Sequence, residues 1–151
     1  MISIELLRRN PFFAGLNEHE LKSIAMISTL VETSANTTLF EEGQTADALY
    51  LLLEGNVTLS CNSPADPKTQ IHIEDVNPGE PFAISALIPP HILAHTARAA
   101  DPCQTIRINA AALRTLCEQD CKVGYMLLRQ VAAAAMERLQ FTRVQLAAER
   151  V

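Results

Sequence analysis

The middle of the chain consists of short runs of β-forming residues that turn residues interrupt. These runs cover residues 30–33, 38–40, 48–53, 57–61, 69–76, 94–99 and 104–108. Gly43 and Gly55 lie in the turns 41–44 and 54–56, where a tight turn needs a positive φ. The 48–53 run is apolar on both faces, so we expect a central strand. Many short strands with regular turns predict a roll, a barrel or a sandwich.

Helical patterns flank this region on both sides. A short helix over 3–9 ends at Asn10-Pro11, and an apolar entry segment with Phe12 and Phe13 follows. Asn17 and Glu20 have the spacing of a capping box, which predicts a second helix over 18–28. Asn109 caps a helix over 110–116, and a long helix follows over 121–149.

These patterns define the expected architecture. We predict an α+β protein with a jelly-roll-like β-roll (a double-stranded β-helix), flanked by N-terminal helices and a long C-terminal helix. The 151 residues fit one domain, divided into N-terminal helices (1–29), the roll (30–108) and C-terminal helices (109–151).

The long C-terminal helix has an apolar seam whose residues step by three or four positions. Its members are Leu128, Val131, Ala135, Leu139, Thr142 and Leu146. A helix of this length reaches ~42 Å, which one small roll rarely covers. We therefore expect a homodimer through this helix. The other interpretation is that the helix packs only along its own roll.

Composition excludes several classes of protein. The formal net charge is −5 and the basic residues do not cluster, so nucleic-acid binding by this chain alone is not expected. No apolar run is long enough to span a membrane, and the N-terminus lacks the pattern of a signal peptide. The four cysteines form no Cys-x-x-Cys motif, although Cys117 and Cys121 could share a helix face. These features predict a cytoplasmic protein with reduced thiols.

Catalytic signatures are missing from the sequence. The four histidines form no His-x-His pair, and no P-loop, dinucleotide or Ser-His-Asp pattern occurs. We expect no enzyme activity, no metal site and no cofactor.

One string carries a family resemblance. Residues 39–57, read as LFEEGQTADALYLLLEGNV, resemble the first half of the cyclic-nucleotide-binding domain family. That family includes the catabolite activator regulators and the regulatory subunits of protein kinase A. Residues 10–16 look like its entry segment, and 78–82 like the lead-in to its phosphate-binding cassette. The resemblance covers about residues 6–148 and implies a regulatory or sensory domain.

The cassette itself departs from the family. Its glycine, which lets the backbone approach the ligand, is replaced by Ala83. Its glutamate, which binds the ribose hydroxyl, is replaced by Ile84, and its phosphate-pairing arginine by Leu93. Loss of two charge-assisted contacts weakens binding by a factor on the order of 10³. We therefore do not expect cyclic AMP to bind in the usual way.

Three interpretations of this pocket remain. Ile84 and Leu93 fill it as extra core, it holds a less polar small-molecule ligand, or it holds a nucleotide through His91, His95, Ser85 or Thr96; the first two are favoured. We assign His91 and His95 to solvent-facing loop positions in preference to a role as metal or haem ligands. The candidate ligand-binding residues are Phe82, Ala83, Ile84, Ser85, Ala86, Leu93, Ala94, His95 and Thr96.

The functional prediction is a non-catalytic regulatory or sensory module. Two alternatives stay open: the sensory half of a transcription regulator that binds a different small ligand, and a ligand-free dimerisation or docking module. A ligand between the roll and the 82–87 segment would signal by shifting the long helix, which requires different affinities for two helix positions.

Overall fold

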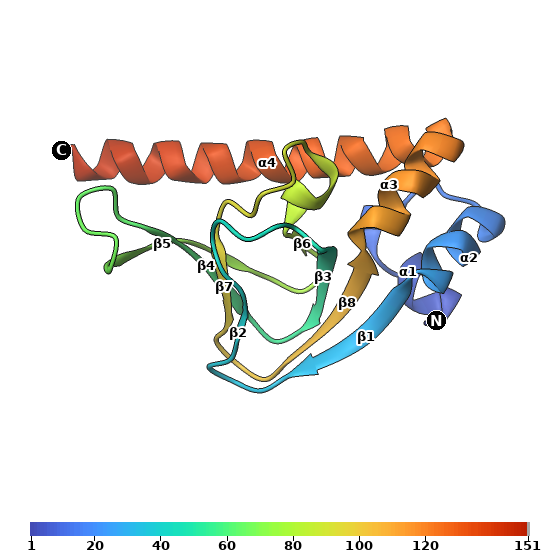
Figure 1. The fold of residues 1–151 in the computed structure, drawn as a ribbon, viewed down its shortest axis with the longest axis horizontal. Coiled ribbons are helices and arrows are strands. Elements are labelled where there is room, and N and C mark those ends of the chain that lie inside the picture. The colour runs from blue at the N-terminus through green and yellow to red at the C-terminus, as the bar shows by residue number, and fades with distance from the viewer. Residues whose placement is uncertain (151) are drawn as a thin grey trace.

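The computed structural model describes residues 1–150 and shows a β-roll beneath one long helix (Figure 1). The strands form two four-stranded antiparallel sheets, with the orders β1-β8-β3-β6 and β2-β7-β4-β5. Their bounds are β1 Ser28–Thr33, β2 Thr38–Phe40, β3 Ala48–Glu54, β4 Val57–Asn62, β5 Gln70–Val76, β6 Pro81–Phe82, β7 Thr96–Ala99 and β8 Cys103–Asn109. Strands distant in sequence are neighbours in each sheet, which confirms the jelly-roll-like α+β architecture.

The 48–53 run forms a central strand, as its two apolar faces predicted. Strand β3 pairs with β8 on one side and with β6 on the other. Leu49, Leu51 and Leu52 have no exposed surface. Burying one such side chain stabilises the fold by roughly 1.5–3 kcal/mol, so this strand anchors the core.

The turn at Gly55 requires glycine for two reasons. Its φ is +95°, in the left-handed region. A Cβ atom there would lie 2.5 Å from the carbonyl oxygen of Pro102, which belongs to the loop before β8. Gly43 has a similar φ of +88° but open space around it, so only the backbone conformation favours glycine there.

The helices have the bounds α1 Ile4–Arg8, η1 Pro11–Phe13, α2 Glu18–Met26, η2 Ile84–Leu87, α3 Ala110–Gln119 and α4 Cys121–Glu149, where η marks a 3₁₀ helix. The capping box before α2 is confirmed. The side chain of Asn17 accepts from the N–H of Glu20, and the side chain of Glu20 accepts from the N–H of Asn17, each at 2.8 Å. Helix α2 ends two residues earlier than predicted, because Ser28 already pairs with β8.

Glu20 also connects α2 to the start of α4. Its carboxylate accepts from the Lys122 ammonium at 2.9 Å. The backbone N–H of Asn17, followed by the hydrogen bond from Lys122, lowers the pKa of Glu20 below its ordinary value. The carboxylate is therefore charged and holds the N-terminal helices against α4.

The two cysteines whose spacing would allow a shared helix face do not share one. Cys117 lies in α3 and Cys121 is the first residue of α4. Asp120 separates the two helices with an extended backbone, and its side chain caps α4 by accepting from the N–H of Val123. The Asp120 cap restarts the helix, which was not apparent from the spacing of the cysteines.

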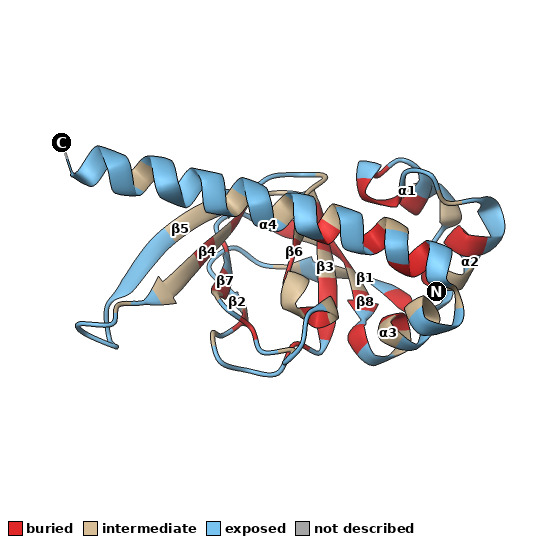
Figure 2. Cartoon of the chain, turned by 90° about the horizontal axis from the view of Figure 1, so that it is seen from above, coloured by how far each residue is buried: buried red, intermediate tan, exposed pale blue. Residues whose placement is uncertain are grey.

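Helix α4 has different surroundings on its two sides. Val123, Leu127 and Val131 are buried against the domain, and these buried positions lie in its N-terminal half (Figure 2). Val131, a member of the predicted seam, packs against the domain of its own chain. The other five seam residues are exposed, including Leu128 and Leu139. The helix therefore packs on its own roll with one face and presents an apolar stripe on another.

Among residues 1–150, no helix combines the length and the hydropathy that crossing a membrane requires.

Candidate ligand-binding site

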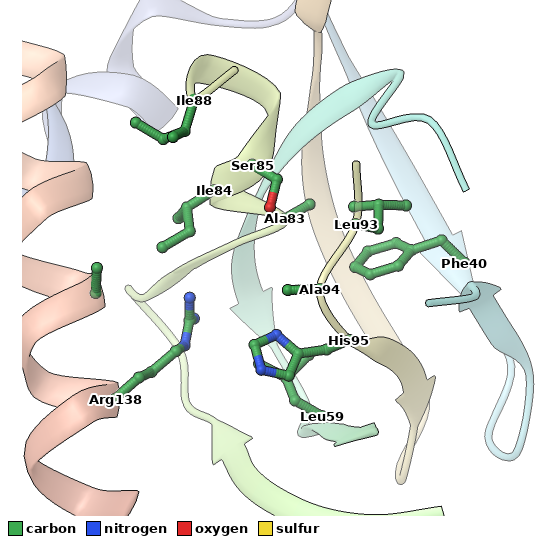
Figure 3. A pocket seen from close by; sticks show the side chains of 11 residues that line it. Phe40, Leu59, Ala83, Ile84, Ser85, Ile88, Leu93, Ala94, His95 and Arg138 are labelled. Carbon is green, nitrogen blue, oxygen red and sulfur yellow. The ribbon is translucent and has the colours of Figure 1, made fainter. Parts of the chain in front are cut away.

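A cavity of about 300 Å³ lies between η2, the segment that leads into β7, and α4 (Figure 3). The apolar side chains in its wall are Phe40, Leu59, Ala83, Ile84, Ile88, Leu93, Ala94 and Ala135. The polar side chains are Ser85, His95 and Arg138. The volume is at the low end for small-molecule sites.

Six of the nine candidate residues line this cavity, namely Ala83, Ile84, Ser85, Leu93, Ala94 and His95. The remaining three have structural contacts instead. Phe82 is fully buried and stacks on Tyr50, with ring centroids 5.1 Å apart. The carbonyl of Ala86 accepts from Arg114 at 2.8 Å, and the hydroxyl of Thr96 accepts from the N–H of Glu42 at 3.0 Å.

Ala83 adopts a backbone conformation that normally favours glycine. Its φ is 58° and its ψ is 39°, in the left-handed region. A residue with a Cβ atom is less stable there by roughly 1–2 kcal/mol. At the position of the cassette's glycine, the chain therefore has a backbone conformation that glycine adopts easily, although the residue is alanine. The added methyl group contributes to the apolar wall.

Ile84 and Leu93 replace the two charged positions of the cassette with hydrocarbon. Leu93 is 5% exposed, and backbone hydrogen bonds hold it in place against the turn at Gly43 and Gln44. Both side chains lie at the cavity wall, and space remains between them and α4. Leu93 belongs to the hydrophobic core and Ile84 packs against it, as the extra-core interpretation expects, but a cavity remains beside them.

Arg138 is the cavity residue that sequence analysis missed. It extends from α4 toward the side of the cavity bounded by Ile84 and His95 (Figure 3). Its Nε donates to the carboxylate of Glu74 on β5, and one Nη donates to the carbonyl of Pro81 at 2.6 Å. The side chains of Arg138 and Glu74 are only 12% and 18% exposed. The pair therefore ties α4 to the roll beside the cavity.

A helical spacing in the sequence was the available signal for Arg138. It lies seven residues after Val131 and eleven after Leu127, on the buried face of α4. A charged residue on a buried face needs a partner, so this spacing indicates a paired arginine at position 138. The cassette is more than forty residues away in the sequence, so its pattern gives no indication of Arg138.

His95 faces the cavity, so its expected role as a solvent-facing loop residue is wrong. Burial, and then the positive charge of Arg138, lower its pKa below the ordinary value, although Glu42 opposes this shift. The imidazole is therefore neutral at neutral pH. His91 lies outside the cavity wall, in a separate groove beside α3 and α4. Residues 1–150 contain no group of three or more His, Cys, Asp or Glu arranged to bind a metal ion.

Comparisons with known proteins agree with the fold. The family model described as "Cyclic nucleotide-binding domain" matches residues 30–120. The chain belongs to the cyclic nucleotide-binding domain family. No curated protein matches the chain significantly.

Three solved structures illustrate the relationship. A Geobacter metallireducens GS-15 protein, designated a cyclic nucleotide-binding protein, is 40% identical with a TM-score of 0.82, over 92% of this chain and 99% of that one. The N-terminal domain of a Streptomyces coelicolor A3(2) transcriptional regulator is 28% identical with a TM-score of 0.67, over 93% and 94%. The sensor domain of the Pseudomonas aeruginosa regulator DNR is 22% identical with a TM-score of 0.71, over 87% and 91%, which shows a shared fold.

Proposed function

We propose that this chain is a non-catalytic regulatory domain that senses a small molecule less polar than a cyclic nucleotide. One observation carries the proposal. The three positions that supply a glycine, a glutamate and an arginine in the family's cassette are Ala83, Ile84 and Leu93, and all three line an open cavity. Domains of transcription regulators from two bacteria have the same fold, which supports a sensory role.

The charges around the cavity favour a ligand that is not a cyclic nucleotide. The Arg138 guanidinium is already paired with Glu74, and the imidazole of His95 is neutral at neutral pH. A phosphate in the usual place of the cassette, beside Leu93 rather than Arg138, therefore meets no free cation, and an uncompensated buried charge is costly. The ribose hydroxyls would meet Ile84 and Leu93, which offer no hydrogen bond. We expect affinity for cyclic AMP to be lower by a factor on the order of 10³ than with the cassette glutamate and arginine present.

Helix α4 is the route for the signal. Ala135 and Arg138 belong to α4 and line the cavity, so a ligand contacts the helix directly. Ala135 is also part of the exposed apolar stripe that we call the outer stripe. Its members are Tyr125, Leu128, Ala132, Ala135, Leu139, Thr142 and Leu146. Their alternating spacing of three and four residues is that of a coiled-coil seam, so we propose a parallel homodimer through this stripe.

A direct test compares cyclic nucleotides with a neutral apolar probe. Isothermal titration with cyclic AMP and cyclic GMP to millimolar concentration should give no heat. The dye N-phenyl-1-naphthylamine should bind with increased fluorescence. The substitution Ala94→Phe, at an exposed position in the cavity wall, should abolish dye binding, whereas Ala100→Phe, at an exposed position outside the wall, should preserve it.

Two results would contradict the proposal. Micromolar binding of a cyclic nucleotide would mean that other donors replace the lost cassette groups. Absence of dye binding, or equal dye binding by both alanine variants, would remove the cavity as a site. A dimer without any ligand would then favour the second candidate, a dimerisation module, for which the outer stripe is the specific observation.

A further inference from the structure

Arg138 has donors that the protein does not use. A guanidinium carries five N–H groups, and two of them contact Glu74 and the carbonyl of Pro81. Within residues 1–150 no third protein acceptor contacts the remaining donors, and the side chain lines the cavity (Figure 3). A largely buried arginine with spare donors beside a cavity is suited to bind an acceptor that enters that cavity.

Glu74 is a partner that a ligand can replace. It lies on β5, the outer strand of its sheet, and its side chain is 18% exposed. A second anion beside Arg138 would be repelled by the Glu74 carboxylate, which can instead turn toward solvent. The incoming anion then takes over the pairing, so the buried guanidinium stays neutralised throughout.

The rest of the wall limits what else the ligand can carry. Apart from Arg138, the polar side chains are Ser85 and the neutral His95. The other lining side chains are hydrocarbon and favour an apolar body. A volume of about 300 Å³ is at the low end for small-molecule sites, so the ligand is a compact molecule.

Building on the proposed function, we propose that the ligand is a small apolar carboxylic acid whose carboxylate exchanges with Glu74 on Arg138. A carboxylate matches the planar fork of the guanidinium with two oxygens. It also has one negative charge, the same as the glutamate that it displaces. A phosphate monoester carries nearly two charges at neutral pH, and only one of them would be compensated.

The experiment uses three probes that share an eight-carbon chain: octanoate, 1-octanol and octyl phosphate. Each displaces N-phenyl-1-naphthylamine from the intact chain, and the competition gives its affinity. We expect octanoate to bind at least tenfold more tightly than 1-octanol or octyl phosphate. Arg138→Gln should remove the preference for octanoate over 1-octanol and leave 1-octanol binding unchanged.

Glu74→Gln provides the second variant. Removal of the competing Glu74 carboxylate should strengthen octanoate binding several-fold. If the ion pair were purely structural, the affinity for octanoate would stay the same or fall. The matched control is Glu137→Gln, which removes a charge from the exposed residue beside Arg138 and should not change the preference. If Arg138→Gln fails to fold, the gain expected for Glu74→Gln still decides the question.

The outcomes separate this inference from the proposed function. Equal affinity of wild type for octanoate and 1-octanol, or weaker octanoate binding by Glu74→Gln, would overturn the acid-binding role of Arg138 and leave the apolar cavity intact. Tighter binding of octyl phosphate would change the ligand class to a phosphate monoester. No binding of any probe or of the dye would overturn the proposed function itself.

Discussion

Replacing Leu139 by glutamate should break the proposed dimer of α4. Leu139 is 51% exposed in the single chain and lies near the middle of the outer stripe. Full burial of a leucine contributes roughly 1.5–3 kcal/mol, so covering the exposed half contributes about 1 kcal/mol. A parallel two-fold dimer places this residue opposite its own copy, and the two copies together contribute about 2 kcal/mol.

The introduced glutamates add a further cost, since two like charges then face each other in a partly buried seam. Repulsion and desolvation of the pair contribute on the order of 1 kcal/mol. The total of about 3 kcal/mol corresponds to a dissociation constant higher by a factor on the order of 10². Sedimentation equilibrium over a wide concentration range measures this constant directly.

Val144→Glu is the matched control for Leu139→Glu. Val144 is 57% exposed and lies on another side of the same helix, outside the outer stripe. It should leave the dissociation constant unchanged within a factor of about 2, because surface substitutions outside an interface cost little. A wild-type chain that stays monomeric at millimolar concentration, or equal weakening by the two variants, would refute the assignment of the stripe.

Three further predictions concern stability, measured by urea unfolding. Gly43→Ala should lower the free energy of unfolding by about 1–2 kcal/mol, because its backbone is left-handed. Gly55→Ala should lower it by at least ~1 kcal/mol more, because its new Cβ would also lie 2.5 Å from a carbonyl oxygen. Equal losses in the two variants would contradict this reasoning. Burial lowers the pKa of His95 from its ordinary 6.5, so the unfolded chain binds the proton more readily and stability should fall as pH drops from 6.5 toward the lowered pKa. His95→Gln should remove that part of the pH dependence, and an unchanged profile would show that the imidazole titrates normally. Asn17→Ala should cost about 1 kcal/mol by removing the cap of α2, and an unchanged midpoint would contradict the capping role.

Elements whose conformation depends on residues close by in the sequence could be predicted from the sequence. The capping box at Asn17 acts within one helical turn, and the bounds of the long helix follow from its continuous pattern. The positive φ of Gly55 is likewise local in origin, whereas its close approach to Pro102 is not. These features are stable for reasons that a window of about ten residues contains, and the structure reproduces them.

Features that depend on contacts between distant segments were missed or misjudged. Strand β6 has two residues, too few to show an alternating pattern, and it exists because Phe82 and Pro81 pair with β3. The burial of Val131 depends on which face of α4 the roll covers, and the apolar pattern alone fits more than one face. The cation of the cavity was missed for the same reason, since Arg138 reaches it only through the packing of α4 on the roll.

The position of Arg138 changes how this domain can couple a ligand to its long helix. An arginine in the cassette would hold an anion on the roll, and α4 would have to detect it indirectly. Here the one cationic side chain in the wall extends from α4 itself and pairs with Glu74 on β5. A ligand that replaces Glu74 breaks the ion pair between α4 and the roll, and at the same time it forms a new contact with Arg138 on α4. Ala135, one turn earlier, belongs to both the cavity wall and the outer stripe, so the same event acts on the surface through which we propose two copies associate.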